Sequence, residues 1–245
     1  MNPESGQESQ SLSEAQRLTG VFHSPGSVFA NIARSGRWWI PLIVTTIIAI
    51  ALVSAVQSRV SVDQMLARAL DNNERFQQLP AEQKEAALSA QRKILPAAML
   101  GGAAVGSAIY LFIAAGALLF VFNLLMDGGL KYKHTLNICS YAMLPPGIVG
   151  AAAMFAVLYL KPPDEFDFQT ALAFNVGAFL STAASAWLKS LAGSIDVFTF
   201  WTIFLLAIGF SRAIPRMTTG RAFGAILAPW AVYVLLKTGW AAMFG

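Results

Sequence analysis

The polar residues that fall within apolar stretches are those that could do chemistry inside a membrane. Asp196 stands at the start of one apolar run, Asn123 lies near the end of another, and Pro145 and Pro146 interrupt a third. A carboxylate at membrane depth can bind a cation or a proton, and a proline pair can leave backbone carbonyls free to line a cavity. Together these four residues are a candidate intramembrane polar site.

Each of these residues also has a structural interpretation, which we favour. Asp196 can cap the helix that follows it and complement the helix dipole. Asn123 can join two helices by hydrogen bonds. The prolines remove two backbone donors and predict a kink or break in their helix. A transport path through these positions remains the alternative.

No strong catalytic or metal-binding motif accompanies them. The sequence lacks HExxH, P-loop, GxGxxG and Gly-x-Ser-x-Gly patterns. His23, His134 and Cys139 are its whole supply of histidine and cysteine, and they are widely separated. We therefore expect a protein that is not an enzyme, with no metal and no cofactor.

The elements that position these residues are long uncharged stretches. Only 12% of the residues are charged, against about a quarter in a soluble domain. The stretch 38–58 has the length of a helix that crosses a hydrocarbon core about 30 Å thick. We predict an all-α polytopic membrane bundle with five transmembrane helices plus interfacial or re-entrant helices. The predicted spans are about 38–58, 96–124, 136–160, 196–212 and 222–242.

The remaining segments complete a single membrane domain over 21–245. Residues 1–20 are rich in Ser, Gln and Glu and are predicted to be a disordered tail. Ser24-Pro25 predicts the start of a short interfacial helix. Residues 59–93 predict an extramembrane helical hairpin, with a capping box at Ser61 and a second helix after Pro80. The segment 168–190, with its apolar part at 171–188, is predicted to re-enter the membrane or lie on it.

Short basic loops predict the orientation of the bundle. Five spans place the loop 127–134 and the Arg-rich loop 212–221 on the side of the N-terminus, whereas six would move the second loop across. The positive-inside tendency favours five, with the N-terminus cytoplasmic and the C-terminus periplasmic. Five cations of these loops form a candidate surface for a protein partner or for anionic lipids. They are Lys131, Lys133, Arg212, Arg216 and Arg221.

Two further partner predictions follow from composition. The net charge of +4 would suggest nucleic acid for a soluble protein, but in a membrane protein it reports orientation, so no nucleic-acid partner is expected. Gly102 and Gly106 form a GxxxG pair, which makes a homo-oligomer possible.

Several short motifs resemble a known family. They are Phe22-x-x-Pro25-x-x-Val28-Phe29-x-x-Ile32, Trp38-Trp39-x-Pro41, Ser140-Tyr141-Ala142-x-Leu144-Pro145, Ser194-Ile195-Asp196-Val197-Phe198-Thr199-Phe200-Trp201, Thr219-Gly220-Arg221-Ala222 and Pro229-Trp230. Over about residues 20–240 this pattern resembles bacterial members of the Yip family of integral membrane proteins. The resemblance implies five transmembrane helices, a cytoplasmic N-terminus and a bacterial inner membrane.

The resemblance does not imply a reaction. Eukaryotic relatives are linked to Rab GTPases, but the aspartate-leucine-tyrosine-glycine motif associated with them is absent here. Our leading hypothesis is a non-enzymatic membrane protein that organises protein partners or lipids. The alternative is a small-solute or ion transporter or channel with a path near Pro145-Pro146 and Asp196.

Overall fold

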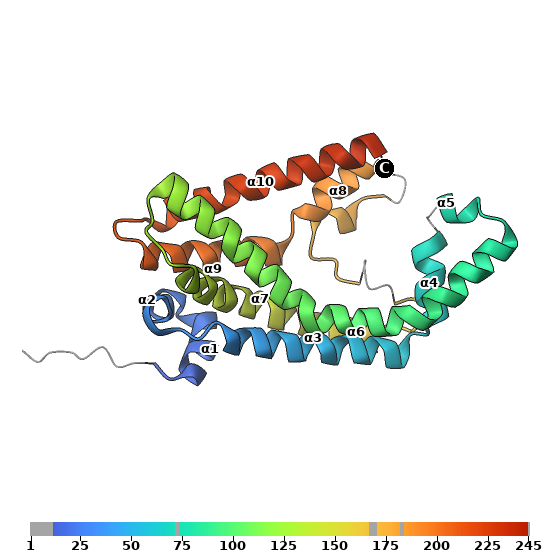
Figure 1. Cartoon of the computed structure of the whole chain (residues 1–245), viewed down its shortest axis with the longest axis horizontal. Coiled ribbons are helices and arrows are strands. Elements are labelled where there is room, and N and C mark those ends of the chain that lie inside the picture. The colour runs from blue at the N-terminus through green and yellow to red at the C-terminus, as the bar shows by residue number, and fades with distance from the viewer. Residues whose placement is uncertain (1–11, 72–73, 167–170, 182–183, 245) are drawn as a thin grey trace, which may run out of the picture.

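The computed structural model of the chain describes residues 12–71, 74–166, 171–181 and 184–244. These residues form a helical bundle without β-strands (Figure 1), and a single isolated backbone bridge joins Asn175 to Asp196. The all-α prediction is therefore confirmed. The predicted disordered tail falls largely on residues 1–11, which lie outside the described residues.

Two N-terminal helices precede the long ones, α1 (Glu14–His23) and α2 (Pro25–Ser35). The prediction of disorder up to residue 20 is wrong from Glu14 onward. Ser13 and Gln16 form a capping box, in which each backbone N–H donates to the other's side chain at 2.9 and 3.3 Å. This cap and the burial of Val21 stabilise the helix. The polar composition of the segment did not indicate it. The start of α2 at Pro25 agrees with prediction.

Four helices of the described residues are long and apolar enough to cross a membrane. They are α3 (Trp39–Arg59), α6 (Ala81–Phe120) with the π-helical turn η1 (Val121–Leu125), α7 (Tyr132–Leu160) and α10 (Thr219–Phe244). The apolar helix α9 (Val197–Ala213) has 17 residues, the lower end of the range of about 17–25 for a spanning helix. These five helices coincide with the five predicted spans.

Helix α7 continues through Pro145 and Pro146. Of the kink or break predicted at this pair, the break is therefore absent. Both prolines are buried, so packing of neighbouring helices can hold the turn in place despite the two missing donors.

Helices α3 and α10 lie along opposite edges of the bundle (Figure 1). Helix α6 crosses from the start of α10 to run beside α3, and α7 and α9 lie between the two edges. Helix α10 meets the α6 segment at η1, and from there the two helices separate (Figure 1). One end of the bundle carries α1, α2 and the connections between α6 and α7 and between α9 and α10.

The opposite end carries α4 (Val62–Asp71) and the short α5 (Glu74–Gln77). The capping box of Ser61 is present, with Gln64 N–H donating to its hydroxyl at 3.2 Å and the return bond at 3.0 Å. Arg92 of α6 pairs with Asp63 of α4 at 2.6 Å. Helix α6 begins directly after Pro80 and continues into the membrane-length segment, so the predicted hairpin and second span share one helix.

The segment predicted to re-enter or lie on the membrane holds two short helices in its described part. These are η2 (Val176–Phe179) and α8 (Ala186–Ser194), which pack on each other, and α8 also packs on α10. Residues 168–170 and 182–183 of this segment lie outside the described residues. Since α8 has nine residues, at about 1.5 Å each it is too short to cross a bilayer.

The largest apolar core lies at the end that carries α1 and α2. Phe122 of η1 stacks on Phe210 of α9 with ring centroids 4.0 Å apart. Gly209 lets α9 approach closely, because a β-carbon there would collide with Ile138 of α7 and Phe29 of α2. This tight packing fixes the ends of α7 and α9, from which the basic loops emerge.

Candidate functional site

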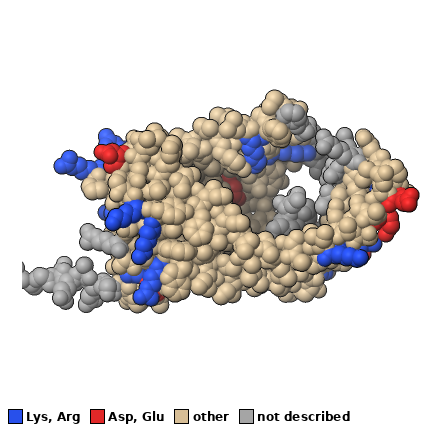
Figure 2. Space-filling view, viewed as in Figure 1, with Lys and Arg blue, Asp and Glu red and all other residues tan. Residues whose placement is uncertain are grey.

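The structure brings the five predicted basic residues to one end of the bundle. Two lie at the start of α7, one lies in the last turn of α9, one lies in the following connection and one lies in the first turn of α10. They are Lys131, Lys133, Arg212, Arg216 and Arg221, and all are exposed. Figure 2 shows Lys and Arg gathered at this end. Within the described residues none of the five forms an ion pair. We call these five residues the basic end.

Asn123 positions the loop that leads to Lys131. Its amide nitrogen donates to the Leu130 carbonyl, and its amide oxygen accepts from the Leu130 N–H, both at 2.9 Å. Gly128 N–H donates to the Phe122 carbonyl at 2.9 Å. Asn123 therefore holds the connection between α6 and α7 in place. Its role is structural, but its side chain bonds to the loop residue Leu130 and not, as predicted, to a second helix.

Two residues of the basic loops have left-handed backbones. Arg216 has a φ of 60° and Asp127 has a φ of 49°. Non-glycine residues rarely adopt this region, and such strain is concentrated at functional positions. At Arg216 the strained turn holds an exposed cation between two apolar helices.

A cavity of about 670 Å³ lies within this end. Its walls come from α2, the start of α7, the end of α9 and the connection that follows. It is lined by Ala30, Ala33, Leu130, His134, Ser211, Arg212, Ala213, Ile214, Pro215 and Arg216. Two guanidinium groups and an imidazole thus share one cavity. Such a lining favours an anionic group with several acceptor oxygens, because arginine donates in a bidentate fork.

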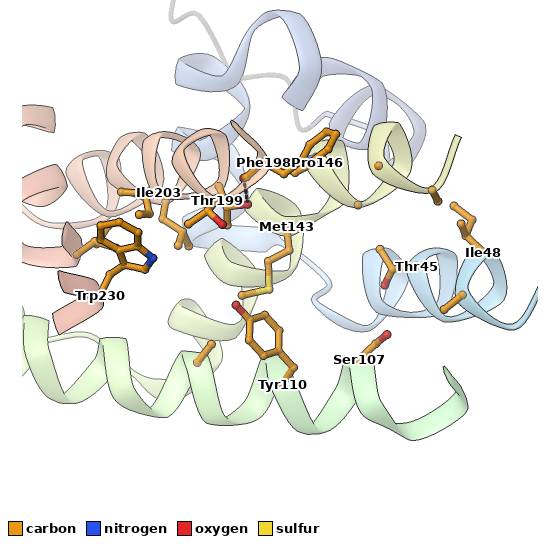
Figure 3. Close-up of a pocket in the computed structure, with 18 of the residues that line it drawn as sticks. Thr45, Ile48, Ser107, Tyr110, Met143, Pro146, Phe198, Thr199, Ile203 and Trp230 are labelled. Atoms are coloured by element: carbon orange, nitrogen blue, oxygen red, sulfur yellow. Dashed lines mark hydrogen bonds between the residues drawn. The ribbon is translucent and has the colours of Figure 1, made fainter. Parts of the chain in front are cut away.

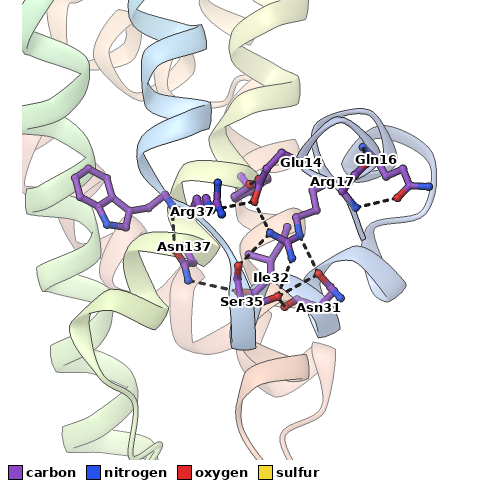
Figure 4. Close-up of polar contacts among 11 residues, drawn as sticks. Glu14, Gln16, Arg17, Asn31, Ile32, Ser35, Arg37 and Asn137 are labelled. Carbon is purple, nitrogen blue, oxygen red and sulfur yellow. Dashed lines mark hydrogen bonds and ion pairs between the residues drawn. The ribbon is translucent and has the colours of Figure 1, made fainter. Parts of the chain in front are cut away.

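A network of polar side chains holds α1 and α2 to each other and to α7 at this end of the bundle (Figure 4). Arg17 is only 4% exposed. Its guanidinium pairs with Glu14 and donates to Asn31 Oδ1 at 2.8 Å and to the Ser35 hydroxyl at 2.8 Å. Glu14 in turn accepts a hydrogen bond from the Tyr141 hydroxyl of α7. The buried charge is therefore fully partnered, and the network ties α1 to both α2 and α7.

A second polar contact holds the passage from α2 into α3. The Trp38 N–H donates to Asn137 Oδ1 at 3.1 Å, and Asn137 Nδ2 donates to the Ile32 carbonyl at 3.4 Å (Figure 4). Gly36 lies against the same amide, where an added β-carbon would sit 3.1 Å from Asn137 Cγ.

Sequence reasoning missed both polar contacts. The Ser13–Gln16 capping box was a readable signal for α1. The pairing of Glu14 with Tyr141 bridges 127 positions, and no local pattern announces it.

The four candidate residues of the intramembrane polar site do not meet. Asp196 caps α9 by accepting from the Thr199 N–H at 2.9 Å, at the end of α9 opposite to Arg212. Asn123 lies in η1, near the basic end, and Pro145 and Pro146 are buried within α7. Asp196, Asn123 and the proline pair therefore lie at three separate places.

A second cavity of about 670 Å³ lies between the long helices (Figure 3). Helices α3, α6, α7, α9 and α10 all contribute to its walls. Labelled in Figure 3 are Thr45, Ile48, Ser107, Tyr110, Met143, Pro146, Phe198, Thr199, Ile203 and Trp230. Its lining has no Lys, Arg, Asp, Glu or His among the described residues. Of the four residues predicted for a polar path, Pro146 is the one among its described lining residues; Thr199, whose N–H donates to Asp196, also lines it.

Two further predictions concern a metal site and the Gly102–Gly106 pair. The described residues contain no cluster of three His, Cys, Asp or Glu that could hold a metal, and Cys139 is buried within α7. No helix of the described chain packs against Gly102 or Gly106, since nothing lies within 4 Å of a β-carbon added at either. A homo-oligomer through this pair stays a prediction.

The family of the chain follows from a match along nearly its whole length. The family model of the Yip1 domain matches residues 19–241, the region that includes every helix from α2 to α9, half of α1 and most of α10. The chain belongs to the Yip family and is a membrane protein with several helices capable of spanning a bilayer. No curated protein and no solved structure matches the chain.

Proposed function

We propose that the chain is a non-enzymatic membrane protein that organises anionic lipids, or a partner protein with an acidic surface, at its basic end. One observation carries this proposal. Five exposed cations from two separate chain segments share one end, and none is neutralised within the described residues. Leaving so many like charges together opposes folding unless an anionic partner is present.

Anionic lipid headgroups are the favoured partner. The cations lie where apolar helices end, which is the level of the headgroups. A cluster of Lys and Arg beside a membrane attracts anionic lipids, with about 1 kcal/mol for each cation near the surface. The cavity with Arg212, Arg216 and His134 can also receive a phosphate group.

We further propose that this end faces the cytoplasm of a bacterial cell and that the chain resides in the inner membrane. The positive-inside tendency supports the orientation. Cys139 is buried, so cysteines introduced elsewhere report topology cleanly. In spheroplasts, a membrane-impermeant maleimide should label Lys93→Cys and leave Lys133→Cys unlabelled until the membrane is opened. The reverse pattern would overturn the orientation.

The lipid proposal is tested by neutralising the basic end. The five residues are changed to Gln, the chain is extracted with its surrounding lipid by an amphipathic copolymer, and phosphatidylglycerol is quantified against phosphatidylethanolamine. Enrichment of phosphatidylglycerol should be lost. The control, Lys84→Gln with Lys93→Gln, removes charge at the opposite end and should keep the enrichment. Equal lipid ratios in all three proteins, combined with capture of an acidic protein by the unaltered chain alone, would assign the basic end to a protein partner.

The transporter alternative has one observation in its favour, the cavity between the long helices. Transport would require a hydrated solute to pass through this cavity, whose lining is mainly apolar and has no charged group among the described residues. Solute flux in liposomes that depends on Asp196, and is reduced in Asp196→Asn, would support this alternative over the lipid proposal.

A further inference from the structure

The geometry points to a lipid-chain site inside the bundle: we propose that the cavity between α3, α6, α7, α9 and α10 binds one acyl chain of a bilayer phospholipid. This inference does not rest on the basic end, because the cavity lies among the long helices and shares no lining residue with the cavity there.

The cavity exists because two helices diverge. Helix α10 touches the α6 segment only at η1 among the closer element contacts, and the two separate toward the opposite end (Figure 1). Small residues leave the space between them unfilled, among them Ala114 of α6 and Gly150 and Ala151 of α7. Figure 2 shows this face hollowed between the two edges. The opening therefore points sideways, where lipid surrounds a spanning helix.

The lining suits a hydrocarbon guest. It is made mainly of apolar side chains, and the hydroxyls of two of its threonines, Thr45 and Thr202, donate to backbone carbonyls of their own helices. The Thr45 hydroxyl donates to the Pro41 carbonyl at 3.0 Å, and the Thr202 hydroxyl donates to the Phe198 carbonyl at 2.8 Å. Apolar cavities stay dry and accept apolar guests. A hydrated ion would lose its water here without any charged group to replace it.

Size and surroundings identify the guest as a lipid chain. The volume of about 670 Å³ lies within the range of about 300–1,000 Å³ of ligand cavities. A partner helix about 10 Å across would fill that volume within roughly two turns, so a second copy of a span does not fit. An acyl chain is slender, and it is the apolar molecule that the bilayer itself supplies at the mouth. An empty space would forfeit the dispersion contacts of its walls.

A photoreactive lipid tests the proposal. The full chain is reconstituted in phosphatidylcholine vesicles that contain a phosphatidylcholine with a diazirine midway along one acyl chain. After illumination, adducts are mapped by mass spectrometry of peptides. We expect adducts on Tyr110, Met143 and Trp230 that saturate at a low fraction of probe. Labelling of these residues that rises in proportion to the probe and never saturates would overturn the proposal, since annular lipid behaves in that way.

A matched pair of variants locates the site. Ala151→Phe fills the cavity, and cavity adducts should be lost. Ala152→Phe adds the same ring at an exposed neighbour outside the lining, and cavity adducts should remain. Ala114→Phe fills the space from α6 and serves as a second filling variant if Ala151→Phe does not fold. Unchanged cavity labelling in a folded filling variant would contradict the assignment.

Discussion

The hydroxyl of Tyr141 in α7 donates a hydrogen bond to the carboxylate of Glu14 in α1, across 127 positions of sequence. Glu14 also pairs with Arg17, which is nearly inaccessible to solvent. The N-terminal helices are therefore a fixed part of the bundle, docked on α7 and α9 beside the basic end. Any ligand at that end meets a surface that these helices help to shape, since Ala30 and Ala33 of α2 line its cavity.

Removing Arg17 should release the N-terminal helices. Arg17→Met leaves Glu14 and Asn31 without their main partner, and breaking a buried pair costs roughly 3–5 kcal/mol. Hydrogen exchange followed by mass spectrometry should show faster exchange over α1 and α2, with the spans unchanged. The control is Arg37→Met, because the side chain of Arg37 is 62% exposed and lies 3.8 Å from Glu14. An exposed pair contributes about 0–1 kcal/mol. Equal exchange in both variants would refute the role of Arg17.

The Tyr141 hydroxyl should contribute separately to this docking. Tyr141→Phe removes one hydrogen bond to a carboxylate, a loss of about 1.5–3 kcal/mol. Paired with Glu14→Gln in a double-mutant cycle, it should show a coupling energy, since contacting residues are not additive. The readout is protection of α1 amides from exchange. Additive effects of the two substitutions would show that the bond contributes nothing.

Alanine substitutions at Gly209 and at Gly224 should change the stability of the bundle in opposite directions. Gly209→Ala should destabilise the bundle by about 1–3 kcal/mol, because its methyl group meets Ile138 and Phe29. Gly224→Ala in α10 meets nothing within 4 Å and should stabilise its helix by up to about 1 kcal/mol. Thermal unfolding in detergent compares the two. A Gly209→Ala protein as stable as the unaltered chain would contradict the packing at this position.

Two substitutions at Arg216 separate the effect of its charge from the effect of its left-handed backbone. Arg216→Gly relieves a left-handed backbone that costs a non-glycine residue about 1–2 kcal/mol, whereas Arg216→Gln keeps the strain. Both should reduce phosphatidylglycerol enrichment, and only Arg216→Gly should raise the unfolding temperature. A gain in stability from Arg216→Gln as well would mean that charge repulsion, not backbone strain, dominates at this position.

Much of the bundle could be predicted from local patterns. Uncharged stretches located the five long apolar helices, because a bilayer demands length and hydrophobicity. Capping patterns located the starts of α2 and α4. Counting five spans predicted that both basic loops lie on one side of the membrane. An odd number of spans separates each loop from the C-terminus, so both loops lie on the side opposite to it.

The remainder depends on distant contacts or on packing. Helix α1 was not predicted, because its polar composition is typical of a disordered segment. In the structure it is stabilised by the buried Arg17, whose guanidinium donates to Asn31 and Ser35 of α2. A kink or break at Pro145-Pro146 was predicted from local rules, but α7 continues through the pair, which is buried among neighbouring helices. Neither cavity could be foreseen, since each arises where elements far apart in sequence fail to fill the space between them.

Binding of anionic lipid at the basic end is tested most directly by the salt dependence of phosphatidylglycerol association with the full chain in lipid nanodiscs. Attraction between exposed charges is screened over about 8 Å at physiological ionic strength and over about 3 Å at 1 M salt. We predict that enrichment of phosphatidylglycerol around the chain falls steeply with salt and is already absent at low salt when the five basic residues are changed to Gln. Enrichment that is insensitive to salt, and equal in the neutralised protein, would contradict it.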